Sequence, residues 1–69
     1  MSEIKTVVRV NSTGTIRIMR GEVGMTFLVE RFSPSPDGPV AHVRDYRFPG
    51  LQRDFQIWSI PKRGYEVVD

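Results

Sequence analysis

Gly21-Glu-Val-Gly-Met-Thr-Phe-Leu-Val-Glu-Arg-Phe32 is the stretch of sequence that decides the fold. It opens on two glycines three residues apart and continues into the longest apolar-rich extended segment of the chain. Phe27 and Val29 have one parity, and Leu28 and Phe32 have the other. Alternate side chains of a strand point to opposite faces, so both faces carry apolar groups, as in a strand inside a sheet or barrel. The stretch therefore predicts an interior strand on which the other strands assemble.

The residues before this stretch predict a β-hairpin. Thr6–Val10 and Thr15–Met19 are rich in β-branched side chains with arginine interleaved, and Asn11–Gly14 between them has a turn composition. Alternation places Arg9 and Arg17 on the face opposite the valines and isoleucines. We expect this basic pair to be solvated or to face a partner.

Further strands are expected after it. Ser33–Pro39 contains three prolines and a glycine, which predicts an exposed loop at a hairpin tip. Strands are expected at Val40–Phe48 and Phe55–Ile60, and Tyr65–Val68 is expected to be a short strand or a 3₁₀ turn followed by a strand. In the first of these, the aromatic residues fall on the opposite parity to Val43, so we expect a β-bulge near residues 44–45.

These segments predict an all-β protein. No segment repeats apolar residues at helical spacing over three turns. Five or six short strands in 69 residues cannot fill two sheets, so we expect one domain, residues 1–69, folded as a small five- to six-stranded antiparallel SH3-like barrel that closes its own edges. Residues 1–5 are expected to be a flexible N-terminus.

The apolar core of so short a chain is small. Residues expected in it are Val8, Val10, Ile16, Ile18, Phe27, Val29, Val43, Phe55, Ile57, Trp58, Ile60 and Val67. Burying one such side chain contributes roughly 1.5–3 kcal/mol, and ordering each residue costs about 1.5 kcal/mol in conformational entropy. The net free energy of folding is therefore close to zero. This favours a protein stabilised by a partner, either an identical subunit or a larger assembly.

Composition excludes several classes of protein. The chain has no cysteine, so disulfides and thiolate metal sites are excluded, and its polar N-terminus lacks the apolar region of a signal peptide. The longest apolar run is far too short to span a membrane, so we expect a cytoplasmic protein. The net charge is +2, with basic and acidic residues alternating and eight arginines against two lysines. Arginine is enriched at interfaces, although codon usage explains the bias equally well.

The entry to the central strand resembles a KOW-type SH3-like barrel. Ile16, Ile18, Gly21 and Gly24 match that pattern, and Phe27 stands where a third glycine is often found. The ending Ile60-Pro61 followed by Tyr65 is similar to that of signalling SH3 domains, with one residue more between them. The resemblance implies a fold whose members bind RNA, ribosomes, polymerases or other proteins, and it does not choose among these partners.

Residues suited to catalysis are few. His42 is the only histidine, and we interpret it as structural or as a surface residue. Glu30 and Asp45 could serve as an acid–base pair only if opposed on neighbouring strands, and we interpret them as ion-pair members. No phosphate loop, nucleotide fingerprint or metal-ligand spacing is present, so we expect no enzyme, no metal, no cofactor and no small-molecule substrate.

Two kinds of macromolecular partner remain. The first is nucleic acid, bound by an arginine-rich barrel face, against the alternative of a solvated barrel exterior. The arginines of that face are Arg9, Arg17, Arg20 and Arg31, with Arg47, Tyr46 and Trp58 beside them.

The second partner is a larger protein or ribonucleoprotein complex, or a second copy of the chain. Trp58, Tyr65, Tyr46 and Phe48 are the expected anchors, and Arg44, Arg47 and Arg63 are the charged contacts around them. Alternatively, the first strand offers a free edge for strand addition, or Trp58 and Tyr65 only plug one end of the barrel. We favour a non-enzymatic adaptor, regulatory or assembly subunit.

Overall fold

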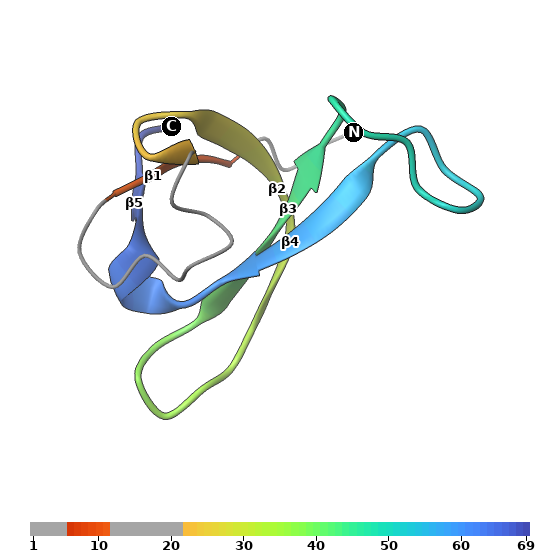
Figure 1. Cartoon of the computed structure of the whole chain (residues 1–69). Helices are drawn as coiled ribbons and strands as arrows, with labels where there is room; N and C mark the ends of the chain where they lie inside the picture. The colour runs from red at the N-terminus through yellow and green to blue at the C-terminus, as the bar shows by residue number, and fades with distance from the viewer. Residues whose placement is uncertain (1–5, 12–21) are drawn as a thin grey trace, which may run out of the picture.

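The protein is one antiparallel sheet. The computed structural model describes residues 6–11 and 22–69, and the strands follow the order β4-β3-β2-β1-β5 in a strongly bent sheet (Figure 1). A three-residue 3₁₀ helix, η2, lies between β4 and β5. The elements are β1 Val7–Val10, β2 Thr26–Ser33, β3 Val40–Asp45, β4 Gln56–Ile60, η2 Lys62–Gly64 and β5 Tyr65–Val67. The prediction of an all-β protein is confirmed. Tyr65–Val67 is a strand, the first of the two alternatives for Tyr65–Val68, and the 3₁₀ helix lies before these residues.

β2 is the middle strand of the five, as its two-sided apolar pattern predicted. Leu28 pairs with Val7 of β1 on one edge and with Arg44 of β3 on the other. Gly24 leads into the strand with a φ of 93°, a conformation that glycine adopts without a steric penalty. Its N–H donates to the carbonyl of Val10 at 2.8 Å, which ties the start of β2 to the end of β1.

The bulge lies in β2 and not in β3. The register between these strands shifts between Val29 and Arg31, whereas the pairing of β3 with β4 is continuous. The predicted bulge near residues 44–45 is therefore wrong. β3 ends at Asp45, whose carboxylate accepts the backbone N–H of Arg47 at 3.0 Å and so forms a turn. Tyr46 and Phe48 consequently belong to the connection after the strand.

β1 is an interior strand. β2 pairs with it along one edge and β5 along the other, from Val8 opposite Val67 to Val10 opposite Tyr65. The expectation that β1 offers a free edge for strand addition is therefore wrong. Its predicted hairpin partner, residues 15–19, lies outside the described residues, as do residues 1–5.

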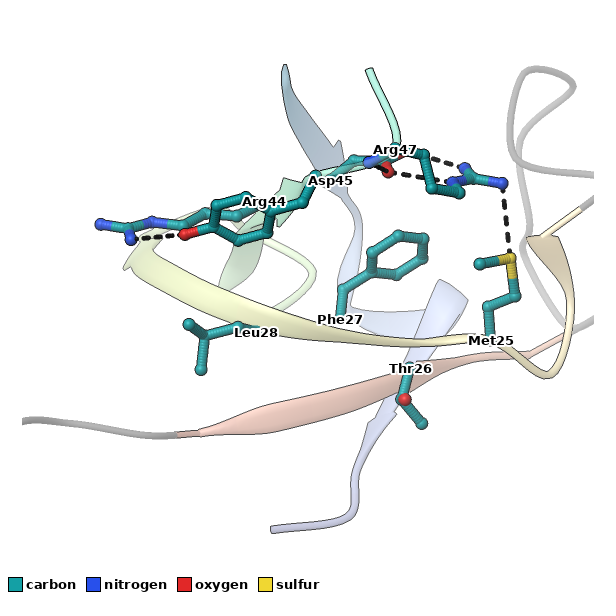
Figure 2. Close-up of a pocket in the computed structure, with 8 residues that line it drawn as sticks. Met25, Thr26, Phe27, Leu28, Arg44, Asp45 and Arg47 are labelled. Carbon is teal, nitrogen blue, oxygen red and sulfur yellow. Dashed lines mark hydrogen bonds and ion pairs between the residues drawn. The ribbon is translucent and has the colours of Figure 1, made fainter. Parts of the chain in front are cut away.

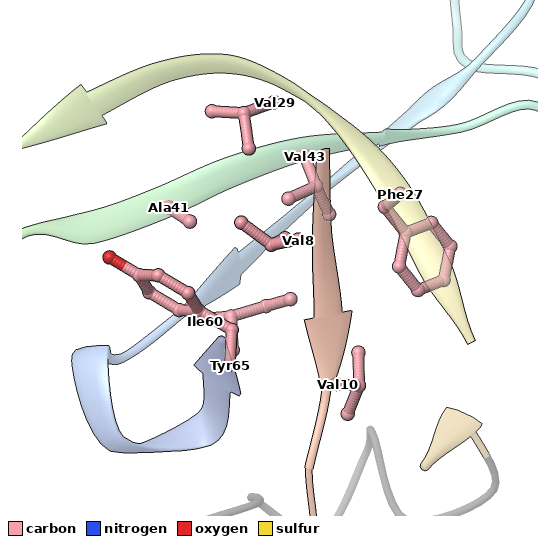
Figure 3. Packing of buried hydrophobic residues seen from close by; sticks show 8 residues of the cluster. All are labelled: Val8, Val10, Phe27, Val29, Ala41, Val43, Ile60 and Tyr65. Atoms are coloured by element: carbon pink, nitrogen blue, oxygen red, sulfur yellow. The ribbon is translucent and has the colours of Figure 1, made fainter. Parts of the chain in front are cut away.

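The core takes side chains from all five strands (Figure 3). Its buried members are Val8, Val10, Phe27, Val29, Ala41, Val43, Ile60 and Tyr65. Trp58 packs against this cluster half-buried, and Phe55 is buried outside it. The expectation for Val67 is wrong, since this side chain is 59% exposed on β5. Ile16 and Ile18 lie outside the described residues.

Two long connections join the strands of the bent sheet. The loop between β2 and β3 is a hairpin tip with exposed prolines, as predicted, and Gly38 there donates to the carbonyl of Ser35 at 3.0 Å. The connection between β3 and β4, residues 46–55, projects away from the strands (Figure 1). β4 and β5 are the edge strands, and within the described residues no ladder joins them, so the described sheet is open.

Candidate interaction surface

Asp45, at the end of β3, is the buried charged side chain among the described residues. Asp45 is 1% exposed because its parity on β3 turns it toward the core side, where Trp58 of β4 also points. Its Oδ2 accepts the indole N–H of Trp58 at 2.7 Å and Nη2 of Arg47 at 2.7 Å. Its Oδ1 accepts Nε of Arg47 at 2.9 Å. We call these three residues the Asp45 cluster.

The Asp45 cluster favours the charged form of its carboxylate. The hydrogen bond from the Arg47 side chain is the main cause that lowers the pKa of Asp45 to about 2, and the Trp58 N–H adds to it against the opposing effect of burial. The same hydrogen bond raises the pKa of Arg47. Asp45 and Arg47 therefore remain an ion pair throughout the physiological pH range.

Arg47 also connects the start of β2 to the end of β3. Nη2 of Arg47 lies 3.2 Å from a carboxylate oxygen of Glu22, and Nη1 lies 3.6 Å from the sulfur of Met25 (Figure 2). The guanidinium carbon lies 5.8 Å from the ring centre of Phe27 and 5.1 Å from that of Phe48. Each of its three side-chain nitrogens thus already donates to a described residue.

A second cluster surrounds Phe55, just before β4. The guanidinium carbon of Arg44 lies 4.6 Å from the ring centre of Phe55, and that of Arg53 lies 5.1 Å from it. The ring of Tyr46 lies at 5.2 Å, tilted by 59°. Arg44 further donates to Glu30 at 2.9 Å and to the hydroxyl of Tyr46 at 3.0 Å. Such cation–aromatic contacts hold the guanidinium planes in place.

The β3–β4 connection contains a hydrogen-bonded turn with an exposed leucine. The N–H of Gly50 donates to the carbonyl of Arg53 at 2.9 Å, and Nε2 of Gln56 donates to the carbonyl of Pro49 at 3.2 Å. A Cβ at Gly50 would overlap the carbonyl oxygen of Phe55, so the turn needs glycine there. Leu51 at its tip is 99% exposed. We call residues 50–53 the loop tip.

Two hollows adjoin this connection. One is a groove of about 390 Å³ between the start of β2, residues 25–28, and residues 44–47 (Figure 2). The other, of about 380 Å³, lies within the loop tip and the start of β4. Residues lining the second hollow are Gly50, Leu51, Gln52, Arg53, Phe55, Gln56 and Ile57.

The structure brings five of the predicted anchors and charged contacts together. Arg44, Tyr46, Arg47 and Phe48 lie at the end of β3 and in the residues that follow, and Trp58 is tied to them through Asp45. Tyr46 and Phe48 are about half exposed, whereas Trp58 is half-buried.

Two predicted contacts lie elsewhere. Tyr65 is 3% exposed in the core, and its hydroxyl donates to the carbonyl of Pro39 at 2.8 Å. Arg63 is exposed on η2, beyond the end of β4 that pairs with Ala41, whereas the other contacts adjoin the end that pairs with Asp45. Neither joins the surface described above.

Leu51 and Arg53 are the surface residues that sequence reasoning missed. The signal was present, since a lone leucine follows Pro49-Gly50 and is followed by polar residues. An apolar residue in a tight turn cannot belong to a strand face, and such a residue is either buried by the loop or presented to solvent.

The two carboxylates weighed for acid–base chemistry do not form a pair. Glu30 is exposed at the bulge of β2 and accepts Arg44, which points away from the core. Asp45 points to the core side and accepts Arg47. Because neighbouring positions on β3 face opposite sides, the two carboxylates serve different arginines.

His42 lies between two serines of the neighbouring strands. Its Nε2 is 2.7 Å from Oγ of Ser33 on β2, and its Nδ1 is 2.9 Å from Oγ of Ser59 on β4. Burial, and then the positive charge of Arg31, lower the pKa of His42. A hydroxyl beside an imidazole is one part of a nucleophilic site, but neither hollow is lined by these residues. We interpret this row as a cross-strand hydrogen-bond ladder.

The arginines proposed for nucleic acid are only partly described. Arg9 donates to Glu66 of β5 at 2.7 Å, and Arg31 is exposed on β2 opposite His42. Both point away from the core, as alternation predicts for Arg9. Arg17 and Arg20 lie outside the described residues.

Comparison with protein families, with curated proteins and with solved structures finds no match to this chain. Among the described residues, no helix is long and apolar enough to cross a membrane. In that same part of the chain, no three His, Asp or Glu side chains are grouped so that they could hold a metal ion.

Proposed function

We propose that this protein is a small non-enzymatic SH3-like barrel module of the cytoplasm that docks on a larger protein or ribonucleoprotein complex through its β3–β4 connection. Closure of the sheet is supported by η2, which leads directly from β4 to β5, and by a core to which all five strands contribute. The role is that of an adaptor, regulatory or assembly subunit.

The observation that carries this proposal is the concentration of exposed apolar side chains beside fixed arginines. Tyr46, Phe48 and Leu51 are exposed within six positions of one connection. Tyrosine and arginine are enriched among the residues that dominate binding energy at interfaces. Side chains already held by ion pairs and ring contacts lose less conformational entropy on binding, which favours affinity.

Nucleic acid is the second candidate and is less well supported. Arg9 and Arg31 share the outer face of the sheet, which favours it. However, Arg9, Arg44 and Arg47 each donate to a carboxylate within the described residues. A phosphate would have to compete with these carboxylates, whereas a dedicated nucleic-acid surface presents free cations.

A photo-crosslinking amino acid at position 51 tests the proposal. The full chain is expressed in its native source with the crosslinker in place of Leu51, and in a matched control in place of Val67, which is also exposed but lies on β5. We expect a discrete protein adduct from position 51 that survives nuclease treatment and is absent from position 67.

The other outcomes are equally informative. Adducts to nucleic acid, or protein adducts that disappear with nuclease, would replace protein docking by the second candidate. Equal labelling from positions 51 and 67 would show that the connection is not a specific interface.

A further inference from the structure

The three arginines of the β3–β4 region differ in how many of their donors are occupied. Arg47 and Arg44 both donate hydrogen bonds to carboxylates, at 2.7 Å and 2.9 Å. The side chain of Arg53 makes no hydrogen bond to the described residues, and its nearest carboxylate oxygen, on Glu30, lies 3.8 Å away. It is also 54% exposed. Among the described residues, Arg53 is thus the guanidinium of this region that donates no side-chain hydrogen bond, so all its donors are left for a partner.

Arg53 is nevertheless held in place. Its guanidinium lies over the ring of Phe55, and Phe55 is itself buried. This contact leaves the guanidinium nitrogens of Arg53 without a hydrogen-bond partner among the described residues, and a guanidinium can bind both oxygens of a carboxylate. The side chain is therefore positioned before any ligand arrives.

The surroundings of Arg53 are polar on one side and apolar on the other. The hollow that it lines is also lined by Gln52 and Gln56, residues whose side-chain amides carry hydrogen-bond donors and acceptors. Leu51 lies at the rim of the same hollow, fully exposed. An acidic group in the hollow would bring its neighbouring residue against Leu51.

We infer that the loop tip recognises a protein segment in which an acidic residue stands next to an apolar one. The carboxylate binds the edge of Arg53 in the hollow, and the apolar side chain packs on Leu51. The inference rests on the proposed docking role and adds the chemistry of the partner. A phosphodiester chain fits this surface less well, because it needs a row of free cations, and the loop tip, residues 50–53, contains one cation, Arg53.

The experiment is a selection of random linear peptides displayed on phage against the folded full-length chain. We expect the enriched peptides to share an aspartate or glutamate adjacent to a leucine, isoleucine, valine or aromatic residue. The affinity of a selected peptide is then measured by titration against the wild type and three variants.

The variants separate the contributions of charge, geometry and apolar contact. Arg53→Gln is expected to weaken binding about tenfold or more, because a charge-assisted hydrogen bond is lost. Arg53→Lys is expected to recover only part of that loss, since lysine lacks the planar edge. Leu51→Ser is expected to weaken binding about fivefold or more through lost apolar contact. Arg63→Gln, an exposed arginine on η2, is the control and should change affinity less than twofold.

The inference is overturned if no peptide is enriched, if the enriched peptides lack acidic residues, or if Arg53→Gln binds them as tightly as the wild type. Circular dichroism of each variant shows that the comparison is made between folded chains. Crosslinking from position 51 can still succeed when the selection fails, so failure of the inference and failure of the docking proposal are distinguishable.

Discussion

The Asp45 cluster and the loop tip each contain one arginine of the β3–β4 connection, but the two arginines are used differently. In the Asp45 cluster, Arg47 donates to a carboxylate that is 1% exposed. In the loop tip, Arg53 approaches its nearest carboxylate no closer than 3.8 Å. An arginine whose donors are occupied by neighbouring groups belongs to the framework, the residues that hold the surface in shape. An arginine whose donors are unoccupied belongs to the contacts, the residues that can bind a partner.

Trp58→Ala is expected to have the largest effect on stability. It removes the packing of the indole against the core and leaves Asp45 without one of its donors, which should lower the free energy of unfolding by about 3 kcal/mol. Urea denaturation followed by far-UV circular dichroism measures this. Phe48→Ala, which removes a half-exposed ring, is the control and should cost about 1 kcal/mol or less. A fully folded Trp58→Ala chain with unchanged stability would place Trp58 among the contacts and remove it from the framework.

Asp45→Asn is expected to remove a pH-dependent contribution of about 2 kcal/mol. The pKa of Asp45 falls from 3.8 to about 2 on folding, so its charge stabilises the protein above pH 4, and this stabilisation is lost as the pH falls toward 2. Urea titrations of wild type and variant between pH 2 and pH 6 measure the difference. The two curves should converge at the acid end, whereas parallel curves would contradict the ion pair with Arg47. Asp54→Asn, at an exposed position, serves as the control.

Gly50→Ala is expected to cost about 1–2 kcal/mol, because the added methyl group overlaps the carbonyl of Phe55 and the turn has to move. Peptide binding by the loop tip should fall together with stability. Gly24→Ala provides a comparison, since its new Cβ meets no neighbour within 4 Å and is opposed only by the φ of 93°. If Gly50→Ala retained full peptide affinity, the shape of the turn would not matter for binding.

Leu51→Ser and Arg53→Gln are expected to have the smallest effects on stability, within about 0.5 kcal/mol of the wild type. Neither side chain is part of the core, and both are exposed. Differential scanning calorimetry measures the stability of these two variants, and Asp45→Asn is measured beside them as the destabilised reference. A substantial loss of stability from either substitution would make the loop tip part of the framework.

The sheet was largely predictable because its pattern is local. Alternation in β1 identified Val8 and Val10 as buried and Arg9 as exposed, and the two-sided apolar pattern of β2 identified the middle strand. The Pro/Gly loop at residues 33–39 followed from residue types with strong conformational preferences. These features need no information about distant parts of the chain.

The remaining features depend on partners that are distant in the sequence. The two edges of β1 are filled by β2 and β5, and neither pairing is encoded in the residues of β1 itself. From the sequence alone, Asp45 is expected to be a surface charge. Its burial depends on Trp58 of the next strand, which pairs with Val43 two positions before Asp45. Tyr65 was counted as a surface anchor, whereas its burial depends on the carbonyl of Pro39 being within reach of its hydroxyl.

The position of β5 beside β1 also determines when this fold can be completed. Residues 8 and 67 are paired, and the N–H of Val7 donates to the carbonyl of Asp69 at 2.9 Å. β2, β3 and β4 can pair in chain order as neighbours, but β1 retains an open edge until β5 pairs with it. Because an unpaired strand edge can pair with another chain, the addition of β5 is the step that removes this aggregation-prone edge of β1.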